Sequence, residues 1–320
     1  MPASTPGYRA LMDWARGHDA VERAGVEGTG SFGAGLARFL KAEGIEVREV
    51  VRPKRRDLYR SGKSDPIDAE AAARAVLAGT APGRPKGADG EVEMIRALRT
   101  ARRSAVKART QAVNQLRALV DTAPEELRDE LRRLFAPGLI RKASRFRLGE
   151  RPEGVLAATK LALRSMARRC RMLSEEVSEF DGQLDWLVGR TAPELVAVEG
   201  VGVDTAASLL IAVGDNPTRL QNEAAFAHLC GVAPIPASSG KVVRHRLNRR
   251  GNRDTNRALY VIAFSRMSHD ERTRDYVARR TREGKSKKEI IRCLKRFIAR
   301  EIYKILIPPS VQESTAFPAP

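Results

Sequence analysis

The chain has 320 residues, 42% of them hydrophobic, which is enough for two or three domains with cores of their own. Its 58 lysines and arginines outnumber its 39 acidic residues and give a net charge of +19, which is typical of proteins that bind nucleic acid. Three widely separated cysteines exclude a CxxC zinc site and a disulfide framework. No apolar run approaches the roughly 20 residues needed to cross a bilayer, so we expect no membrane partner and a cytoplasmic location.

Residues 1–80 have the pattern of an α/β domain. Strand, turn, helix and strand follow one another, which is the order expected of a parallel sheet with crossover connections. The turn Gly28-Thr29-Gly30-Ser31 follows the first strand, which ends at Glu27. The expected elements are a helix over 8–16, a strand over 20–26, a helix with Leu36 and Leu40, a strand over 46–51 and a helix over 66–77. Residues 79–90, rich in glycine and proline, are expected to form a flexible linker.

Residues 81–190, which include the end of this linker, are expected to form long coiled-coil helices. Apolar side chains three and four apart make one stripe from Leu98 to Leu119, and basic side chains such as Arg99 and Arg102 are expected on the opposite face. A second stripe from Leu163 to Leu187 follows a heptad pattern. The two helices either pack together as an antiparallel hairpin or pack against a second protomer, and the sequence favours neither.

Residues 191–306 are expected to form a helical C-terminal domain, followed by a disordered tail over 307–320. Two short helices joined by a turn with Gly200 and Gly202 resemble a helix-hairpin-helix unit. Glycines let a backbone approach a phosphate, and the N–H groups that begin the second helix can bind it. A plain helical corner is the alternative. A basic segment follows and is expected to bind nucleic acid through Lys241, Arg244, Arg246, Arg249, Arg250 and Arg253.

Three carboxylates near the N-terminus are candidate metal ligands. Glu27 ends a strand, and Asp65 and Asp68 lie three residues apart at the start of a helix. Mg²⁺ prefers hard oxygen ligands, and two such ions can hold both the attacking and the leaving oxygen of a phosphodiester. Helix capping by Asp65 and a favourable interaction of Asp68 with the helix dipole explain the same residues equally well.

Four sequence blocks in a fixed order carry a family resemblance. They are Gly-Val-Glu-Gly-Thr-Gly (25–30), Lys-Ser-Asp-Pro-Ile-Asp-Ala-Glu (63–70), Phe-Ala-His-Leu-Cys-Gly-Val-Ala-Pro (226–234) and Ser-Ser-Gly (238–240). Together they resemble the DEDD-type transposases of the IS110 group of insertion sequences. The resemblance implies a ribonuclease-H-like, resolvase-like N-terminal domain and a helical C-terminal transposase domain.

The resemblance also implies a mechanism and partners. Ser239, with Ser238 as the fallback, would be the nucleophile of DNA strand exchange through a covalent phosphoserine. Glu27, Asp65 and Asp68 would hold Mg²⁺. The implied partners are the DNA of the element ends and target, a structured noncoding RNA, and further copies of the chain in a dimer or tetramer. The implied location is the prokaryotic cytoplasm, in association with the nucleoid. The residues alone are equally consistent with Ser239 being an ordinary serine in a flexible loop.

One expected ligand has no counterpart in this chain. Family members generally begin with an apolar strand that ends in an aspartate, before the segment that corresponds to Gly7-Tyr8-Arg9. Asp13 lies in a helical stretch and Asp19 at the far end of the following strand, so neither is expected to replace it. We therefore expect an N-terminally truncated domain without strand-transfer activity. The alternatives to an active transposase are a non-catalytic truncated copy that binds nucleic acid and a Holliday-junction-resolvase-like nuclease.

Overall fold

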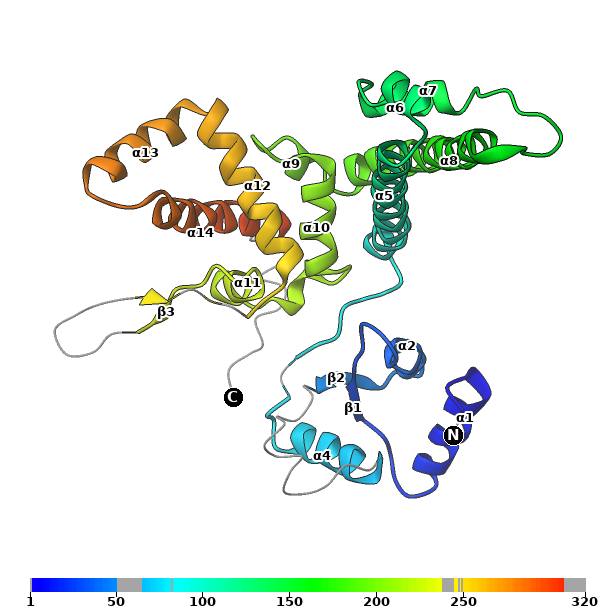
Figure 1. The fold of residues 1–320 in the computed structure, drawn as a ribbon. Helices are drawn as coiled ribbons and strands as arrows, with labels where there is room; N and C mark the ends of the chain where they lie inside the picture. The colour runs from blue at the N-terminus through cyan, green and yellow to red at the C-terminus, as the bar shows by residue number, and fades with distance from the viewer. Residues whose placement is uncertain are drawn as a thin grey trace. The chain divides into compact units, whose positions relative to one another are not determined.

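The computed structural model describes residues 2–50, 65–81, 83–237, 245–246, 248 and 250–307. The described part is mostly helical and holds two small two-stranded sheets (Figure 1). The chain divides into two compact units. The first combines residues 1–93 with residues 197–320, and the second consists of residues 94–196.

The N-terminal part of the first unit has the predicted α/β order. Strands β1 and β2 pair in parallel, with Glu27 opposite Val50, and a core that includes Met12, Val26 and Leu40 packs on them. Helix α4 packs on β1 because Gly25 has no side chain: a Cβ there would lie 3.0 Å from the Ala72 carbonyl oxygen. The elements are α1 (Thr5–Arg16), β1 (Arg23–Glu27), α2 (Ala34–Ala42), β2 (Glu46–Val50) and α4 (Asp65–Leu77).

The glycine- and proline-rich segment after α4 has fixed backbone partners. The Glu49 N–H donates to the Gly83 carbonyl over 2.7 Å. Further on, the Gly87 N–H donates to Asn216 Oδ1 over 2.7 Å, and the Val92 N–H donates to Asp215 Oδ1 over 2.8 Å. The described residues of this segment are therefore anchored at several points, whereas composition alone predicted a flexible linker.

The second unit is built from helices that surround one apolar core. Leu116, Leu127, Leu139 and Leu163 come from four different helices and pack in that core. The heptad seam predicted for the last long helix is buried at Leu163, Cys170, Val177, Leu184 and Leu187. Its other three members are half-buried, namely Met166, Leu173 and Phe180. The helices are α5 (Glu91–Asp121), α6 (Glu125–Leu131), α7 (Ala136–Ala143), α8 (Gly154–Thr191) and α9 (Pro193–Val196).

The basic face predicted for α5 needs one correction. Arg99 was expected on the exposed side of the helix, but its exposed fraction is only 8%. Ala105 and Leu116 of the predicted stripe are buried, whereas Leu98 and Ala101 are only half-buried and Ile95 is buried near the start of the helix. Arg102 forms an ion pair with Asp181 of α8, so the two long helices contact each other within one chain. Packing against a second protomer stays a prediction.

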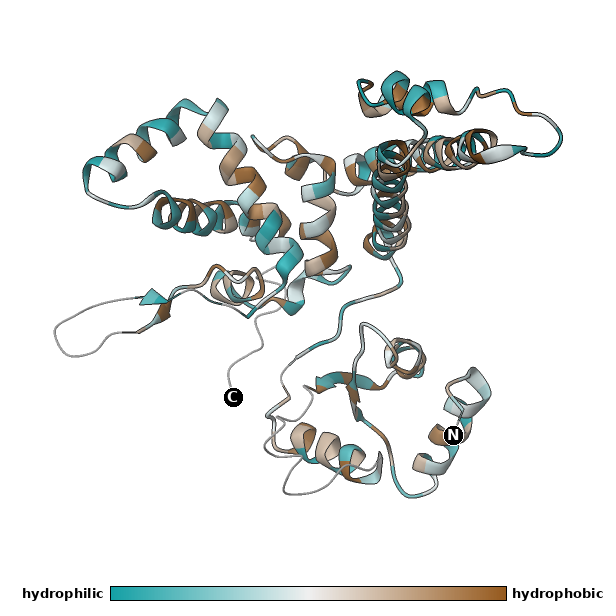
Figure 2. Ribbon diagram, in the orientation of Figure 1, coloured by the Kyte–Doolittle hydropathy of each residue, from teal (hydrophilic) through white to brown (hydrophobic). Residues whose placement is uncertain are grey.

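The C-terminal part of the first unit is a helical bundle with α12 at its centre. Helices α10 and α14 pack on α12, and Leu209, Ile262 and Ile298 are among the side chains buried there. Figure 2 shows α12 as hydrophilic at its N-terminal end and apolar in its middle. The elements are α10 (Val203–Val213), η1 (Pro217–Arg219), α11 (Glu223–Leu229), β3 (Ile235–Pro236), β4 (His245–Arg246), α12 (Arg253–His269), α13 (Glu271–Arg282) and α14 (Lys287–Leu306).

The C-terminal end of this region differs from its prediction at one residue. Ile307, assigned from the sequence to a disordered tail, is buried, and its N–H donates to the Tyr303 carbonyl over 2.9 Å. Residues 308–320 lie outside the described residues. Among the helices that the structure describes, none is both long and apolar enough to cross a membrane.

Candidate functional site

The candidate carboxylates lie on neighbouring elements. Glu27 is exposed and ends β1, and Asp68 is half-buried in the first turn of α4. Because Ala72 of α4 lies against Gly25, the helix crosses β1 two residues before Glu27 and one turn after Asp68. The side chain of Asp65 lies outside the described part of the structure.

The ligand set is suitable for Mg²⁺ by its chemistry, since carboxylate oxygens are hard donors. Among the side chains that the structure describes, no three acidic, histidine or cysteine groups come together as a metal site. Glu70, on the same helix, is engaged in another way: its carboxylate pairs with Arg74 over 2.7 Å. The metal site therefore stays a prediction for Glu27, Asp65 and Asp68.

The predicted glycine turn is present between α9 and α10. Gly200 has a φ of +79°, which favours glycine, and Gly202 caps the N-terminus of α10, where Asp204 is exposed but Thr205 and Ala206 are buried. A Cβ at Gly200 would lie 3.2 Å from the Ile262 carbonyl oxygen, so the turn sits close against α12. The helix before it, α9, has only four residues. Phosphate binding by this turn stays a prediction.

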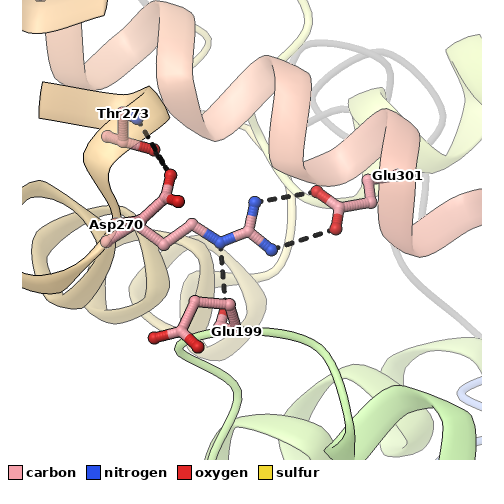
Figure 3. A network of polar contacts seen from close by, with 5 residues as sticks. Glu199, Asp270, Thr273 and Glu301 are labelled. Carbon is pink, nitrogen blue, oxygen red and sulfur yellow. Dashed lines mark hydrogen bonds and ion pairs between the residues drawn. The ribbon is translucent and has the colours of Figure 1, made fainter. Parts of the chain in front are cut away.

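An arginine from α12 fixes this turn in place (Figure 3). Arg266 Nε donates to the Glu199 carbonyl over 2.8 Å, and its two terminal nitrogens bind the carboxylate of Glu301 on α14 over 2.8 and 3.1 Å. This paired geometry is the strong form of an arginine–carboxylate contact. The backbone immediately before Gly200 is therefore held rigidly to two helices.

A short hairpin borders the segment that contains the candidate serine. Strands β3 and β4 are antiparallel, with Ile235 opposite Arg246 and Pro236 opposite His245. Several predicted site residues lie outside the described residues, namely Ser238, Ser239, Lys241, Arg244 and Arg249. Arg246, Arg250 and Arg253 are described and exposed.

A cationic cavity of about 680 Å³ lies beside this hairpin. Both ends of the hairpin contribute to it, Pro234 before β3 and His245 in β4, and α14 supplies much of the remaining wall. Its only described acidic lining residue is Glu289, whose carboxylate accepts hydrogen bonds from Ser286. The basic lining residues are His245, Arg246, Lys285, Arg292, Lys295 and Arg296.

One of these cations is buried in a polar network. Lys295 is 7% exposed, and its Nζ donates to Asn256 Oδ1 over 2.9 Å. Burial and then the nearby charge of Arg292 lower the pKa of Lys295 from its ordinary value. Asn256 Nδ2 in turn donates to the carbonyls of Cys230 and Gly231 over 2.9 and 3.1 Å. The wall of the cavity is thus tied to the chain just before β3.

Two glycines allow a close backbone approach next to this network. Gly231 and Gly251 have φ values of +65° and +103°. A Cβ on Gly251 would lie 2.6 Å from the Gly231 nitrogen, which no side chain can tolerate without movement of the backbone. The Asn252 N–H also donates to the Leu229 carbonyl over 2.7 Å. The segments that precede β3 and follow β4 are therefore fixed to one another.

Sequence reasoning did not identify the contribution of α14 and Asn256 to this site. The basic residues of α14 are visible in the sequence, but nothing there shows that three of them, Arg292, Lys295 and Arg296, line the cavity beside the hairpin. Asn256 has one weak signal: asparagine is unfavourable inside a helix, so its presence there indicates a side-chain partner.

The comparisons with known proteins match both parts of the first unit and extend into the second. The Transposase IS116/IS110/IS902 family matches residues 192–278, and the DEDD transposase family of IS110 matches residues 1–124. The chain carries the transposase domains of the IS110/IS116/IS902 family. The C-terminal transposase match extends from before α10 into α13, so it includes the hairpin and Asn256.

Two curated relatives come from insertion elements. An uncharacterized 43.6 kDa protein of insertion element IS110 from Streptomyces coelicolor is 31% identical over 184 residues, covering 49% of this chain and 45% of the relative. An uncharacterized 42 kDa protein of insertion element IS900 from Mycobacterium paratuberculosis is 28% identical over 148 residues, covering 45% of this chain and 37% of the relative. The matched part therefore spans less than half the length of each of these relatives.

Proposed function

We propose that this chain acts as a DNA transposase that exchanges strands at the ends of an insertion element, with Ser239 as the nucleophile and Ser238 as the fallback. The two transposase matches support the reaction class. The observation that carries the proposal is the cationic cavity, because β4 and Pro234, the residue just before β3, both line its wall and residues 238–244 connect these two strands. Its five lysine and arginine side chains against one carboxylate make it suited to a phosphodiester, and four of the five remain after Arg296 is set aside as the ion-pair partner of Glu223.

In this proposal the serine oxygen attacks the phosphorus atom and forms a new P–O bond. The bond from phosphorus to the leaving deoxyribose oxygen breaks, and the hydroxyl proton passes to a base. Negative charge develops on the phosphoryl oxygens, where cations such as Arg246 and Arg292 stabilise it most in the transition state. The attack of water in a resolvase-like nuclease would use the same cations without needing Ser239.

The second part of the proposal is a Mg²⁺ site at Glu27, Asp65 and Asp68, where a bound metal would supply Lewis-acid assistance. Its support is the oxygen ligand set and the packing of α4 on β1. Mg²⁺ affinity measured by titration calorimetry should fall in Glu27→Gln and stay unchanged in Glu70→Gln, whose carboxylate pairs with Arg74. Equal Mg²⁺ affinity in both variants would rule out this assignment of ligands.

On the resemblance alone, the proposed partners are DNA, a structured noncoding RNA and further copies of the chain, in a prokaryotic cytoplasm. A strand-exchange assay on a plasmid with the element ends tests the reaction. If three acidic ligands suffice for the reaction, contrary to the expectation from the sequence, denaturation in detergent should leave protein bound covalently to DNA for the wild type and for Ser104→Ala, an exposed serine in α5. The covalent product should vanish in Ser239→Ala.

Three other outcomes separate the alternatives. Cleavage that survives in Ser239→Ala and Ser238→Ala would support a resolvase-like nuclease. Salt-dependent DNA binding without cleavage or strand exchange would support a non-catalytic nucleic-acid-binding protein. The absence of DNA binding in every salt condition would refute the proposed function itself.

A further inference from the structure

Helix α12 carries a row of exposed side chains that the bundle does not use. Arg253, Arg257, Tyr260 and Phe264 are spaced four, three and four residues apart, so they share one face of the helix. Tyr260 is 45% exposed and Phe264 is 52% exposed. Their rings stack with centroids 6.2 Å apart and an interplanar angle of 18°. The four residues are called the α12 stripe below.

The other face of α12 explains why the stripe points outward. Leu259, Ile262 and Ala263 are buried, so the helix already packs through these residues. Turning Tyr260 and Phe264 inward would expose that apolar face, which costs more free energy than leaving two rings in water. The stripe is therefore a stable feature of the bundle.

A cavity of about 360 Å³ lies at the N-terminal end of the stripe. Arg253, Arg257 and Tyr260 line it, together with Arg250 from the segment before the helix. Positive charge is thus concentrated at one end of the row and the stacked rings lie at the other. This arrangement combines the two features that bind a single nucleic-acid strand: arginines for the phosphates and flat rings for the bases.

We propose that the α12 stripe binds an unpaired DNA strand, with bases stacked on Tyr260 and Phe264 and phosphates held by Arg253 and Arg257. The inference rests on the proposed function, because strand exchange exposes unpaired DNA beside the site. Duplex DNA does not fit the rings, since its base faces are already covered by neighbouring bases. A second copy of this chain, with a net charge of +19, does not match the arginines of the stripe.

Fluorescence of 2-aminopurine in a single-stranded DNA oligonucleotide tests the stacking. The wild type should quench it on binding. Tyr260→Ala and Phe264→Ala should each weaken binding by about tenfold, the effect of losing one stacked base. The matched control is Phe135→Ala, which removes an 85% exposed ring from α7's N-cap position and should leave the affinity unchanged.

The salt dependence of the same affinity tests the arginines. Arg253→Gln and Arg257→Gln should each reduce the slope of log affinity against log salt by about 0.7, the value for one phosphate contact on a single strand. Tyr260→Ala should weaken binding without changing this slope. Circular dichroism should show equal helix content in all variants, because each altered side chain is exposed.

Several results would overturn the proposal. Unchanged affinity for the oligonucleotide in Tyr260→Ala and Phe264→Ala would refute base stacking. Loss of a dimer in those variants, measured by sedimentation, would assign the stripe to contacts between copies. Tighter binding of an RNA oligonucleotide of the same sequence would refute the assignment to DNA. Binding of duplex DNA alone would leave the proposed function intact while refuting this inference.

Discussion

Replacement of Asn256 by leucine tests the polar network that supports the cationic cavity. Asn256→Leu removes the acceptor of the buried Lys295 ammonium and the donor to the Cys230 and Gly231 carbonyls. A buried polar group that loses its partner costs about 1–3 kcal/mol, and a charged group costs more. We expect a loss of about 3 kcal/mol in the free energy of unfolding, mostly from the unpaired ammonium.

Pulse alkylation of Cys230 in a urea titration measures this loss locally, because the thiol is buried in the folded protein. A loss of about 3 kcal/mol corresponds to a shift of about 1.5 M in the urea midpoint. The matched control is Asn114→Leu, at an exposed position of α5, which should change the midpoint little.

A second substitution separates the charge from the packing. The double variant Asn256→Leu with Lys295→Met replaces the buried polar pair with an apolar pair, so about 2 kcal/mol of the loss should be recovered. The claim that this network stabilises the cavity wall would be refuted by either of two results. One is a double variant whose cost equals the sum of the costs of Asn256→Leu and Lys295→Met alone, and the other is a cost of Asn256→Leu below about 1 kcal/mol.

Three further predictions concern the stability of the two units. Gly251→Ala should cost about 3 kcal/mol in a urea titration, because its Cβ would lie 2.6 Å from a backbone nitrogen at a φ of +103°. Burial raises the pKa of the Cys230 thiol to about 12, so the thiol's contribution to the free energy of unfolding should be complete below pH 9 and lost as pH rises toward 12. In urea titrations at a series of pH values, Cys230→Ala should remove this loss of stability between about pH 9 and 12. Leu127→Ala, at a buried position of α6, should cost about 3 kcal/mol and speed hydrogen exchange in α6.

The sequence was most informative where one residue pattern decides the structure locally. The alternation of strand, glycine turn and helix predicted β1, α2 and β2, and β2 begins at Glu46 as expected. The heptad spacing of α8 identified its buried face from Leu163 to Leu187. Boundaries were less accurate: α1 begins at Thr5 and not at residue 8, because Ser4 caps the helix there.

Contacts between distant parts of the chain were not predictable in this way. Lys295 and Asn256 are 39 residues apart, and no local pattern pairs them. The anchoring of Gly87 and Val92 on the loop after α10 likewise depends on residues more than 120 positions away. In α5, the predicted stripe holds at Ala105 and Leu116, but the spacing of apolar residues did not show that Arg99 is buried near the start of the helix.

The sequence block 226–234, one of the four that carry the family resemblance, packs beneath the cationic cavity and supports its wall. Phe226 is fully buried and packs against Tyr303 with ring centroids 6.0 Å apart. Cys230 is buried too, its carbonyl accepts from Asn256, and Gly231 receives the close approach of Gly251. These residues hold together the two ends of the hairpin that borders the candidate serine. The recognisable block is therefore constrained mainly by packing, while the exposed arginines and rings of the surrounding surface contact the nucleic acid in our proposals.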